Sequence, residues 1–296
     1  MRFVLVGGSG YIGSAVSRKL QSLGHEVINV SRTAKGSAGA KGVSYDHLAL
    51  MCDGADAVIN LAGANIGEKR WSVSRMKELV DSRILPTRAI VEAIGACANR
   101  PALISISGVG YYGPTTVPSN EAVGHGNNFP ALICAEWEHE ALQALSLGER
   151  SAPRVVILRM APILDPKEGP LGRMLPFVKA FIGGPLGSGR QYFPWIHRDD
   201  AVDAVIWAAT TPSASGPYNI VAPDMVTMKQ FAKTLGKVMS RPMFFRVPSI
   251  VLLLVFGRLS QVVYTGINAV PSRILGTSFT FRYPRLEGAL RDLLGR

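Results

Sequence analysis

Near its start the chain reads Val4-Leu5-Val6-Gly7-Gly8-Ser9-Gly10-Tyr11-Ile12-Gly13, an apolar run that leads into regularly spaced glycines. Gly7, Gly10 and Gly13 form a GxxGxxG pattern between a predicted strand and a predicted helix. In such a turn the first glycine permits the tight bend, the second lets the backbone approach a phosphate, and the third lets helix and strand pack closely. The positive end of the helix dipole faces the anion. The stretch therefore predicts a Rossmann-type site for the pyrophosphate of a dinucleotide.

Beyond this turn, apolar runs typical of buried strands alternate with stretches of helical spacing. We expect strands at residues 3–6, 26–30, 56–61, 102–107, 154–159 and 218–221, and helices at residues 12–23, 73–98, 129–145, 199–209 and 227–239. Strands that alternate with helices indicate βαβ units and a parallel sheet with helices on both faces. The predicted fold class is α/β, a Rossmann doubly wound parallel sheet.

The character of the sequence changes after Leu164. Proline, glycine and arginine are dense across residues 166–190, and the tail from residue 248 to 296 has mostly helical spacing with proline and glycine breaks. We therefore expect a dinucleotide-binding domain at residues 1–165 and a smaller, mostly helical substrate lobe at residues 166–296. Some strands of that lobe are expected to return to the main sheet.

The end of the second predicted strand indicates which dinucleotide is bound. Folds that prefer NAD place an acid about 20 residues after the glycines, where it holds the ribose 2′-hydroxyl. Here the strand ends in Ser31 and Arg32, and no acid occurs between Glu26 and Asp46. A serine and an arginine, with Lys35 nearby, suit a 2′-phosphate, so the sequence favours NADP(H). The alternative is that Arg32 is only a solvated cation of the loop.

The amino-acid composition limits the kinds of binding partner that we expect. The 296 residues are 47% hydrophobic and 18% charged, which predicts a folded chain with a large core, and the formal net charge is +11. A basic surface suits an acidic protein partner or an anionic small-molecule substrate, with a basic surface that has no special partner as the alternative. No run of Lys and Arg exceeds two residues, so no nucleic-acid partner is expected. The apolar run at residues 250–256 is too short to span a bilayer and predicts a buried helix start rather than a membrane contact.

Cysteine and histidine usage predicts neither disulfides nor a metal. Cys52, Cys97 and Cys134 stand alone, and the five histidines form no metal-binding pair. No signal peptide is visible, because the first strand begins at Arg2. We expect a reducing compartment, the cytoplasm, with the mitochondrial matrix as the alternative.

Two further stretches complete a pattern that resembles a known family. Asn60-Leu61-Ala62-Gly63 ends the third strand, and Ser105–Gly113 is a serine-containing strand that ends in Tyr-Tyr-Gly. With the glycine turn, they resemble the epimerase-like branch of the extended short-chain dehydrogenase/reductase superfamily, which contains nucleotide-sugar epimerases. Further similar stretches are 69–71, 82–83, 184–191, 195–200 and 281–284, so the resemblance covers nearly the whole chain.

The resemblance implies a Rossmann domain with a substrate lobe and an NADP-dependent oxidoreductase or epimerase. It also implies that residues of the third strand flank the cofactor and that residues of the next helix approach it. The expected cofactor-binding residues are Gly7, Gly10, Tyr11, Ile12, Gly13, Ser31, Arg32, Asn60, Leu61, Ala62, Gly63, Glu78 and Arg83.

The chain departs from the superfamily at the catalytic pair. Active relatives carry Tyr-x-x-x-Lys, in which the tyrosine transfers a proton and the lysine lowers its pKa. Phe129 and Ile133 stand at those positions here, which puts standard hydride chemistry in doubt. Ser107 and Tyr111 are the remaining catalytic candidates, with packing under the loop as the alternative for Tyr111. Cys134 has no predicted base beside it and is a weak nucleophile candidate.

Polar groups of the second half are the candidates for substrate binding. Arginine forks suit phosphates and carboxylates, and the candidates are Arg159, Arg173, Arg190 and His197. Asp199 and Asp200 are expected to cap the helix that they precede. Two functions follow: an NADP-dependent oxidoreductase or epimerase acting on a small anionic substrate, or a non-catalytic NADP(H)-binding scaffold, sensor or accessory subunit.

Overall fold

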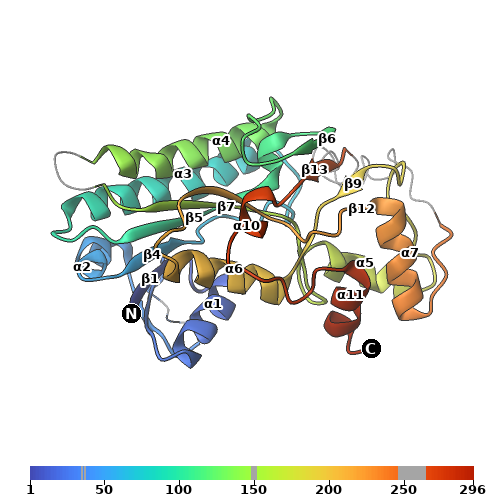
Figure 1. The fold of residues 1–296 in the computed structure, drawn as a ribbon, viewed down its shortest axis with the longest axis horizontal. Helices are drawn as coiled ribbons and strands as arrows, with labels where there is room; N and C mark the ends of the chain where they lie inside the picture. The colour runs from blue at the N-terminus through green and yellow to red at the C-terminus, as the bar shows by residue number, and fades with distance from the viewer. Residues whose placement is uncertain (35, 37, 148–151, 246–264) are drawn as a thin grey trace.

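A seven-stranded sheet lies at the centre of the molecule in a computed structural model, which describes residues 1–34, 36, 38–147, 152–245 and 265–296. Figure 1 shows the sheet between two layers of helices. The strand order is β11-β7-β5-β4-β1-β2-β3, and every neighbouring pair is parallel. The strands are β1 (Arg2–Val6), β2 (Glu26–Val30), β3 (Lys41–Val43), β4 (Ala57–Asn60), β5 (Ala102–Gly108), β7 (Val155–Met160) and β11 (Gly216–Ile220). The predicted fold class is confirmed.

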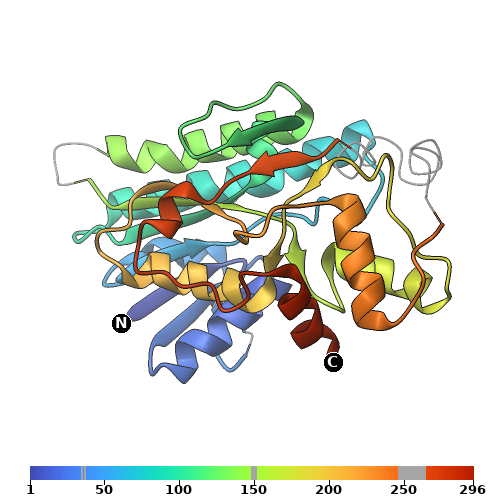
Figure 2. The same cartoon turned by 45° about the vertical axis from the view of Figure 1, so that its right-hand side comes forward.

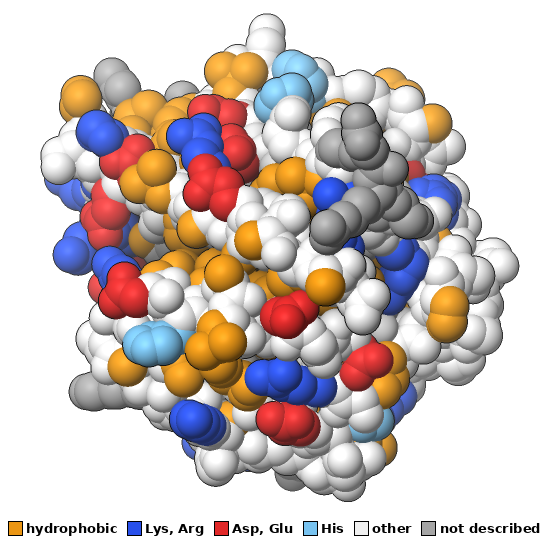
Figure 3. Space-filling view, turned by 90° about the vertical axis from the view of Figure 1, so that its left-hand side faces the viewer, with side chains coloured by type: hydrophobic (Ala, Val, Ile, Leu, Met, Phe, Trp, Pro, Cys, Tyr) orange, Lys and Arg blue, Asp and Glu red, His pale blue; other side chains and the backbone are white. Residues whose placement is uncertain are grey.

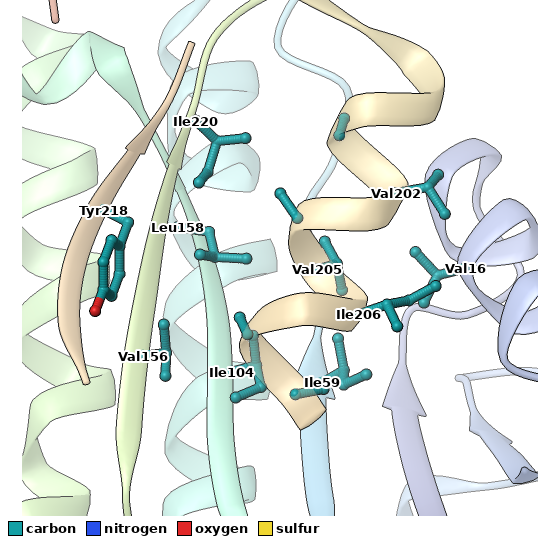
Figure 4. Close-up of a cluster of buried hydrophobic side chains, with 14 of the residues drawn as sticks. Val16, Ile59, Ile104, Val156, Leu158, Val202, Val205, Ile206, Tyr218 and Ile220 are labelled. Carbon is teal, nitrogen blue, oxygen red and sulfur yellow. The ribbon is translucent and has the colours of Figure 1, made fainter. Parts of the chain in front are cut away.

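Helices cover both faces of the sheet. On one face lie α1 (Tyr11–Ser22) and α6 (Arg198–Thr210), which pack against each other, and on the other α2 (Leu48–Cys52), α3 (Val73–Ala96) and α4 (Phe129–Leu142). Figure 4 shows Val205 of α6 on the side of the helix toward Ile59 and Ile104 of the sheet, and Val202 and Ile206 toward Val16 of α1. These side chains are buried, and burying each one stabilises the fold by roughly 1.5–3 kcal/mol.

The first strand explains why the sequence reads as an unbroken apolar run. Successive side chains of a strand point to opposite faces. Phe3 and Leu5 belong to the core under α1 and α6, whereas Val4 and Val6 belong to the core under α2, α3 and α4. All four side chains are fully buried, as expected for a strand covered on both faces.

A second lobe follows the main sheet and has its own core around Trp195 and Phe231 (Figure 2). Its helices are α5 (Gly169–Lys179), α7 (Met228–Met239) and α11 (Leu286–Leu294), whereas α10 (Ser272–Leu275) packs against β11 and places Ile274 in the core of the main sheet. Two short strand pairs support it: β8 (Ile163–Leu164) with β10 (Ile196–His197), and β9 (Tyr192–Phe193) with β12 (Val226–Thr227). A third pair, β6 (Thr115–Ser119) with β13 (Ile267–Ala269), contributes Ala269 to the core of the main sheet. Because β11 pairs with β7, residues from both sides of position 165 build the main sheet.

Several element boundaries differ from the sequence-based expectation. α4 ends at Leu142 and continues as a 3₁₀ turn, Gln143–Ser146. In the described part of the tail, α10 and α11 are helical and β13 is a strand, so the tail is less helical than expected. The expected helix start at residues 250–256 and the predicted contribution of Lys35 lie outside the described residues.

The cap of α6 was also predicted wrongly. His197, not an aspartate, is the N-cap, and its Nδ1 accepts the backbone N–H of Asp199 at 3.0 Å. Asp200 is fully buried, and its carboxylate accepts the backbone N–H groups of Arg282 and Tyr283 at 2.8 and 3.0 Å. That carboxylate therefore attaches the C-terminal tail to α6.

Two whole-molecule properties bear on partners. No helix among the described residues is long and apolar enough to cross a membrane. On the face in Figure 3, cationic and anionic side chains are interspersed among hydrophobic ones, so the positive charge is not gathered into one block there.

Candidate dinucleotide site

The glycine turn joins β1 to α1 at the carboxyl edge of the sheet. Gly7 has φ +83°, a left-handed conformation that favours glycine, and its N–H donates to the Val30 carbonyl at 3.1 Å. A Cβ on Gly13 would lie 2.5 Å from the Gly7 carbonyl oxygen, so only glycine lets α1 approach the strand this closely. Gly10 is the N-cap of α1, which has no side-chain cap and no acid in its first turn. The first turn of α1 therefore presents backbone amides and positive dipole toward this edge.

The end of β4 lies directly against this turn. A Cβ on Gly7 would meet the backbone of Leu61 and Ala62 at 2.9 Å. Asn60 is fully buried, where its amide donates to the Thr87 hydroxyl at 2.8 Å and its carbonyl accepts the Ala62 N–H at 3.2 Å. The Asn60 side chain therefore shapes the Leu61–Gly63 turn from below, while Gly63 is exposed.

The end of β2 supplies a cation on the other side of the turn. Ser31 is buried and Arg32 is exposed. Glu78, on α3, lies near enough to Arg32 and Lys69 to interact with both, and it forms an ion pair with Arg75 at 2.7 Å. The hydrogen bond from Arg75, helped by the other two charges, lowers the pKa of Glu78. Residues of β2 and α3 thus meet at one end of the site.

Two arginines of α3 hold the loop that follows Gly63. Arg83 donates to the Ala64 carbonyl at 3.1 Å, and its guanidinium lies 5.1 Å from the centroid of Trp137. Arg75 is buried and donates to the Asn65 carbonyl at 2.6 Å. Trp71 closes the loop by donating to the Ile66 carbonyl. Arg83 therefore lies beside Gly63, with its donors directed to the Leu79 and Ala64 carbonyls.

The positions of the missing Tyr-x-x-x-Lys pair are occupied by an apolar cluster. Phe129 and Ile133 share one flank of α4 and pack with Trp71 and Leu79. The rings of Phe129 and Trp71 meet edge to face, with their centroids 5.2 Å apart. Phe129 and Ile133 thus lie on the same helix face, and neither side chain can transfer a proton.

Ser107 is not placed to orient a substrate. It is only 4% exposed, and its hydroxyl donates to Glu138 at 2.7 Å. Glu138 also accepts two hydrogen bonds from Arg159, at 2.9 and 2.8 Å, and both side chains are buried. The bonds to Glu138 outweigh the effect of burial and hold the pKa of Arg159 above its ordinary value. The structure therefore places Ser107 and Arg159 in one hydrogen-bonded network around Glu138, and Arg159 also lines a groove beside Tyr111.

Tyr111 lies on a different flank of α4 from Phe129. The Tyr111 ring lies over the Arg159 guanidinium, 3.5 Å from it, and lines a groove of about 620 Å³ with Leu132 and Ala135. Because helical positions advance by about 100° per residue, Leu132 and Ala135 project to another side of α4 than the apolar cluster does. The geometry favours the packing alternative for Tyr111 over the proton-donor role.

Two further candidates are buried. The Cys134 thiol is buried, which raises its pKa to about 11, so it is not a thiolate nucleophile at neutral pH. His197 is fully buried and bonds Asp292 through Nε2 at 3.1 Å, besides capping α6. The expectation that His197 reaches a substrate is therefore corrected, because both ring nitrogens are engaged within the fold.

Arg173 and Arg190 remain exposed. Within the described ranges neither makes an ion pair. Arg173 extends from α5 toward the Ala64–Trp71 loop, where a Cβ on Gly67 would lie 3.3 Å from its Nη1. Arg190 is in the glycine-rich loop before β9. Arg173 therefore bridges the second lobe and the loop beside the glycine turn.

Tyr11 connects the glycine turn to the second lobe. It interacts with Asp165 and Arg198, which form an ion pair at 2.9 Å. Burial, together with the Asp165 carboxylate, raises the pKa of Tyr11 to about 12. Sequence reasoning missed Asp165, Glu138 and Arg75, because an isolated acid or arginine carries no spacing signal until the fold supplies its partner.

In the parallel sheet the chain runs outward from β1 to β2 and then returns to β4 on the other side of β1. The strand order therefore reverses at the glycine turn, and parallel α/β sheets bind ligands at such a switch point. That arrangement defines a dinucleotide-binding Rossmann protein of the short-chain dehydrogenase/reductase class. Residues 3–221 match the NAD dependent epimerase/dehydratase family, and residues 247–293 match a domain of unknown function, DUF1731. The chain belongs to the NAD-dependent epimerase/dehydratase family, as its resemblance predicted.

Relatives extend over the whole chain. The mouse epimerase family protein SDR39U1 is 36% identical over 304 residues, which cover 99% of this chain and 100% of the mouse protein. A chloroplastic SDR39U1 homolog from Arabidopsis thaliana is 34% identical over 99% of this chain and 87% of its own length. The structure of human SDR39U1 with NADPH superimposes with a TM-score of 0.91 at 33% identity, over 100% of this chain and 99% of the human one.

Proposed function

We propose that this protein binds NADPH across the glycine turn. The single observation that carries the proposal is the uncapped first turn of α1 at Gly10, packed between the ends of β2 and β4. Its backbone amides suit the pyrophosphate. Arg32 at the end of β2 suits the 2′-phosphate, and the human relative, 33% identical, is described with NADPH.

A titration with both nucleotides tests the cofactor. We expect NADPH to bind more tightly than NADH, and Arg32→Ala to weaken NADPH roughly 10- to 100-fold, because a hydrogen bond to a charged group contributes about 1.5–3 kcal/mol. NADH affinity should stay unchanged in that variant. Arg18→Ala, which removes an exposed arginine from α1, is the matched control and should change neither affinity. Equal affinities of the wild type for the two nucleotides would contradict the assignment.

The reaction that we propose is NADPH-dependent oxidoreduction or epimerisation of a small anionic substrate. Arg173 supports it, because it is exposed and reaches from the second lobe to the loop beside the glycine turn. A guanidinium there suits a carboxylate or phosphate. With Phe129 and Ile133 in place of the usual pair, the proton must come from water or from the substrate. Arg173→Ala should raise KM for an anionic substrate more than it lowers kcat.

The apolar cluster at Phe129 and Ile133 also favours a second candidate, a non-catalytic NADPH-binding scaffold or sensor. Oxidation of bound NADPH, followed across a panel of carbonyl compounds and nucleotide sugars, separates the two. Turnover of any compound supports the enzyme. If no compound is turned over while NADPH still binds, the result supports the non-catalytic scaffold or sensor.

We further propose a reducing compartment, the cytoplasm or the mitochondrial matrix. Cys52, Cys97 and Cys134 are all buried and form no disulfide, which suits such a compartment. Fractionation of cells that express the tagged protein tests the location.

A further inference from the structure

A row of lysines runs along the outer side of α7. Lys229, Lys233 and Lys237 are exposed and four residues apart, so they lie on one side of the helix, and Arg241 continues the row past its end. The four cations line a groove of about 580 Å³, whose other residues include Ala232, Gly236 and Pro242 of the same segment. Figures 1 and 2 show α7 at the outer edge of the second lobe.

Few carboxylates offset this charge. The α7 sequence contains three lysines and neither Asp nor Glu, and the same two residue types are missing from α5. Lys237 pairs with Glu287 at 2.7 Å, and Glu287 also binds Arg291. Among the described residues, Lys229 and Lys233 have no carboxylate within ion-pair distance. The row therefore presents unneutralised positive charge to its surroundings.

Large apolar side chains project beside the cationic row. They come from α5, from the turn after it and from the segment after α7, and each is at least half exposed: Phe177 58%, Phe181 50%, Ile182 52%, Phe244 85% and Phe245 58%. The two segments touch, since a Cβ on Gly184 would collide with the Phe245 backbone and one on Gly183 would lie 2.8 Å from the sulfur of Met243. These five apolar residues thus come from two segments that touch, and they are called the cluster below.

The cluster and the cationic row are continuous. The Arg241 guanidinium lies 4.3 Å from the centroid of the Phe181 ring, and Phe244 lines the same groove as the lysines. Phe181 has φ +63°, a conformation that side chains other than glycine rarely adopt. A large apolar side chain held outward by an uncommon backbone conformation points to a functional surface rather than to a chance exposure.

We propose that this α7 surface, formed by the row Lys229, Lys233, Lys237 and Arg241 and by the cluster Phe177, Phe181, Ile182, Phe244 and Phe245, docks onto an anionic phospholipid bilayer. The lysines match the lipid phosphates, and the phenylalanines and isoleucine enter the boundary of the acyl chains. A lipid surface is complementary to both halves of the patch. A nucleic acid would use the charge and the rings but gains no stacking from aliphatic Ile182. This proposal differs from the sequence-based expectation of no membrane contact, which was made on residues 250–256, and it does not depend on the cofactor assignment.

Co-sedimentation of the full chain with phosphatidylglycerol and phosphatidylcholine vesicles tests the proposal. We expect binding to phosphatidylglycerol but not to phosphatidylcholine, and weaker binding at high salt, because salt screens charges beyond a Debye length of about 8 Å at physiological ionic strength. Changing Lys229, Lys233 and Lys237 together to Gln should lower the partition coefficient about 100-fold, at roughly fivefold per cation.

Two further variants separate the possible explanations. Arg18→Gln, Lys77→Gln and Lys167→Gln together remove the same charge from exposed positions elsewhere and should leave binding unchanged. Phe177→Ser with Phe244→Ser removes exposed rings, so the melting temperature and NADPH affinity should hold while vesicle binding falls at least tenfold.

Three results would overturn the proposal. The first is equal binding to the two lipids, and the second is an equal loss of binding in the two triple variants. The third is full vesicle binding by the phenylalanine variant, together with loss of that binding when heparin is added. That result would show that the lysine row binds a soluble polyanion.

Discussion

At the residue scale, Glu138 determines which of the sequence candidates face the site. Its two oxygens accept from Arg159 and from Ser107, and Arg159 in turn lies against the ring of Tyr111. Arg159 also donates to the Tyr112 hydroxyl at 3.0 Å, which donates to Asn219. One buried carboxylate thus holds Ser107 and Arg159 within the fold, and Tyr111 packs on Arg159 at the edge of a groove.

Glu138→Gln should destabilise the protein strongly. It leaves the Arg159 charge buried without its partner, and breaking a buried ion pair costs about 3–5 kcal/mol. Glu140→Gln on the same helix is the matched control. It breaks the pair with Arg88, in which Arg88 is 53% and Glu140 14% exposed, and should cost less than Glu138→Gln because Arg88 keeps contact with water. Urea unfolding measures both, and a similar loss in the two variants would contradict the structural role of Glu138.

The sequence could not have shown this network. Ser107 and Glu138 are 31 positions apart, and Arg159 follows 21 positions later, with no motif spacing among them. The residue types alone suit catalysis and anion binding as well as they suit a buried network. The glycines of the turn could be predicted, because their role is local and depends only on the strand and helix that flank them.

At the scale of elements, the periodicity of apolar residues predicts the long helices and strands and misses the short ones. β1 and β4 were predicted from apolar runs, and α3 and α7 from helical spacing. α5 was missed, because Pro170 and Pro176 and its glycines mask the helical pattern. The two-residue strands β8, β9, β10 and β12 leave no periodic signal, and tertiary contacts set them.

The packing of α1 on the glycine turn gives a prediction for this element. Gly13→Ala should destabilise the protein by about 1–3 kcal/mol and weaken NADPH binding, because the new methyl group would lie 2.5 Å from the Gly7 carbonyl oxygen and the backbone must shift. Gly288→Ala in α11 is the matched control. Its methyl group meets nothing within 4 Å, so it should stabilise the protein by roughly 0.5–1 kcal/mol. Thermal unfolding measures both, and a neutral Gly13→Ala would show that α1 does not need this contact.

At the scale of the whole molecule, the C-terminal tail is attached to α6 through polar contacts. Asp200 accepts from the backbone of Arg282 and Tyr283. His197 stacks on the Tyr283 ring with the centroids 3.8 Å apart, and it bonds Asp292 of α11. These residues are visible in the sequence, but the partners lie more than 80 positions apart, so no sequence pattern could predict which of them would contact each other.

This attachment makes stability depend on pH. Burial lowers the pKa of His197 below its ordinary value of about 6.5. Below that pH the unfolded chain binds a proton that the folded protein does not, so the free energy of unfolding should fall as the pH decreases from about 6.5 toward the folded pKa. His197→Asn keeps an N-cap but cannot titrate, so its stability should change less between about pH 7.5 and about pH 5.5. Equal changes in the two proteins, measured by urea unfolding, would show that His197 is not the titrating group.

A crystal structure with NADPH tests the central claim most directly. We predict the pyrophosphate at the backbone amides of residues 10–13 and the 2′-phosphate within about 3 Å of Ser31 or Arg32. The nicotinamide should lie toward the apolar cluster of Phe129 and Ile133. Nucleotide density elsewhere on the chain, or a 2′-phosphate in solvent away from the end of β2, would contradict the account.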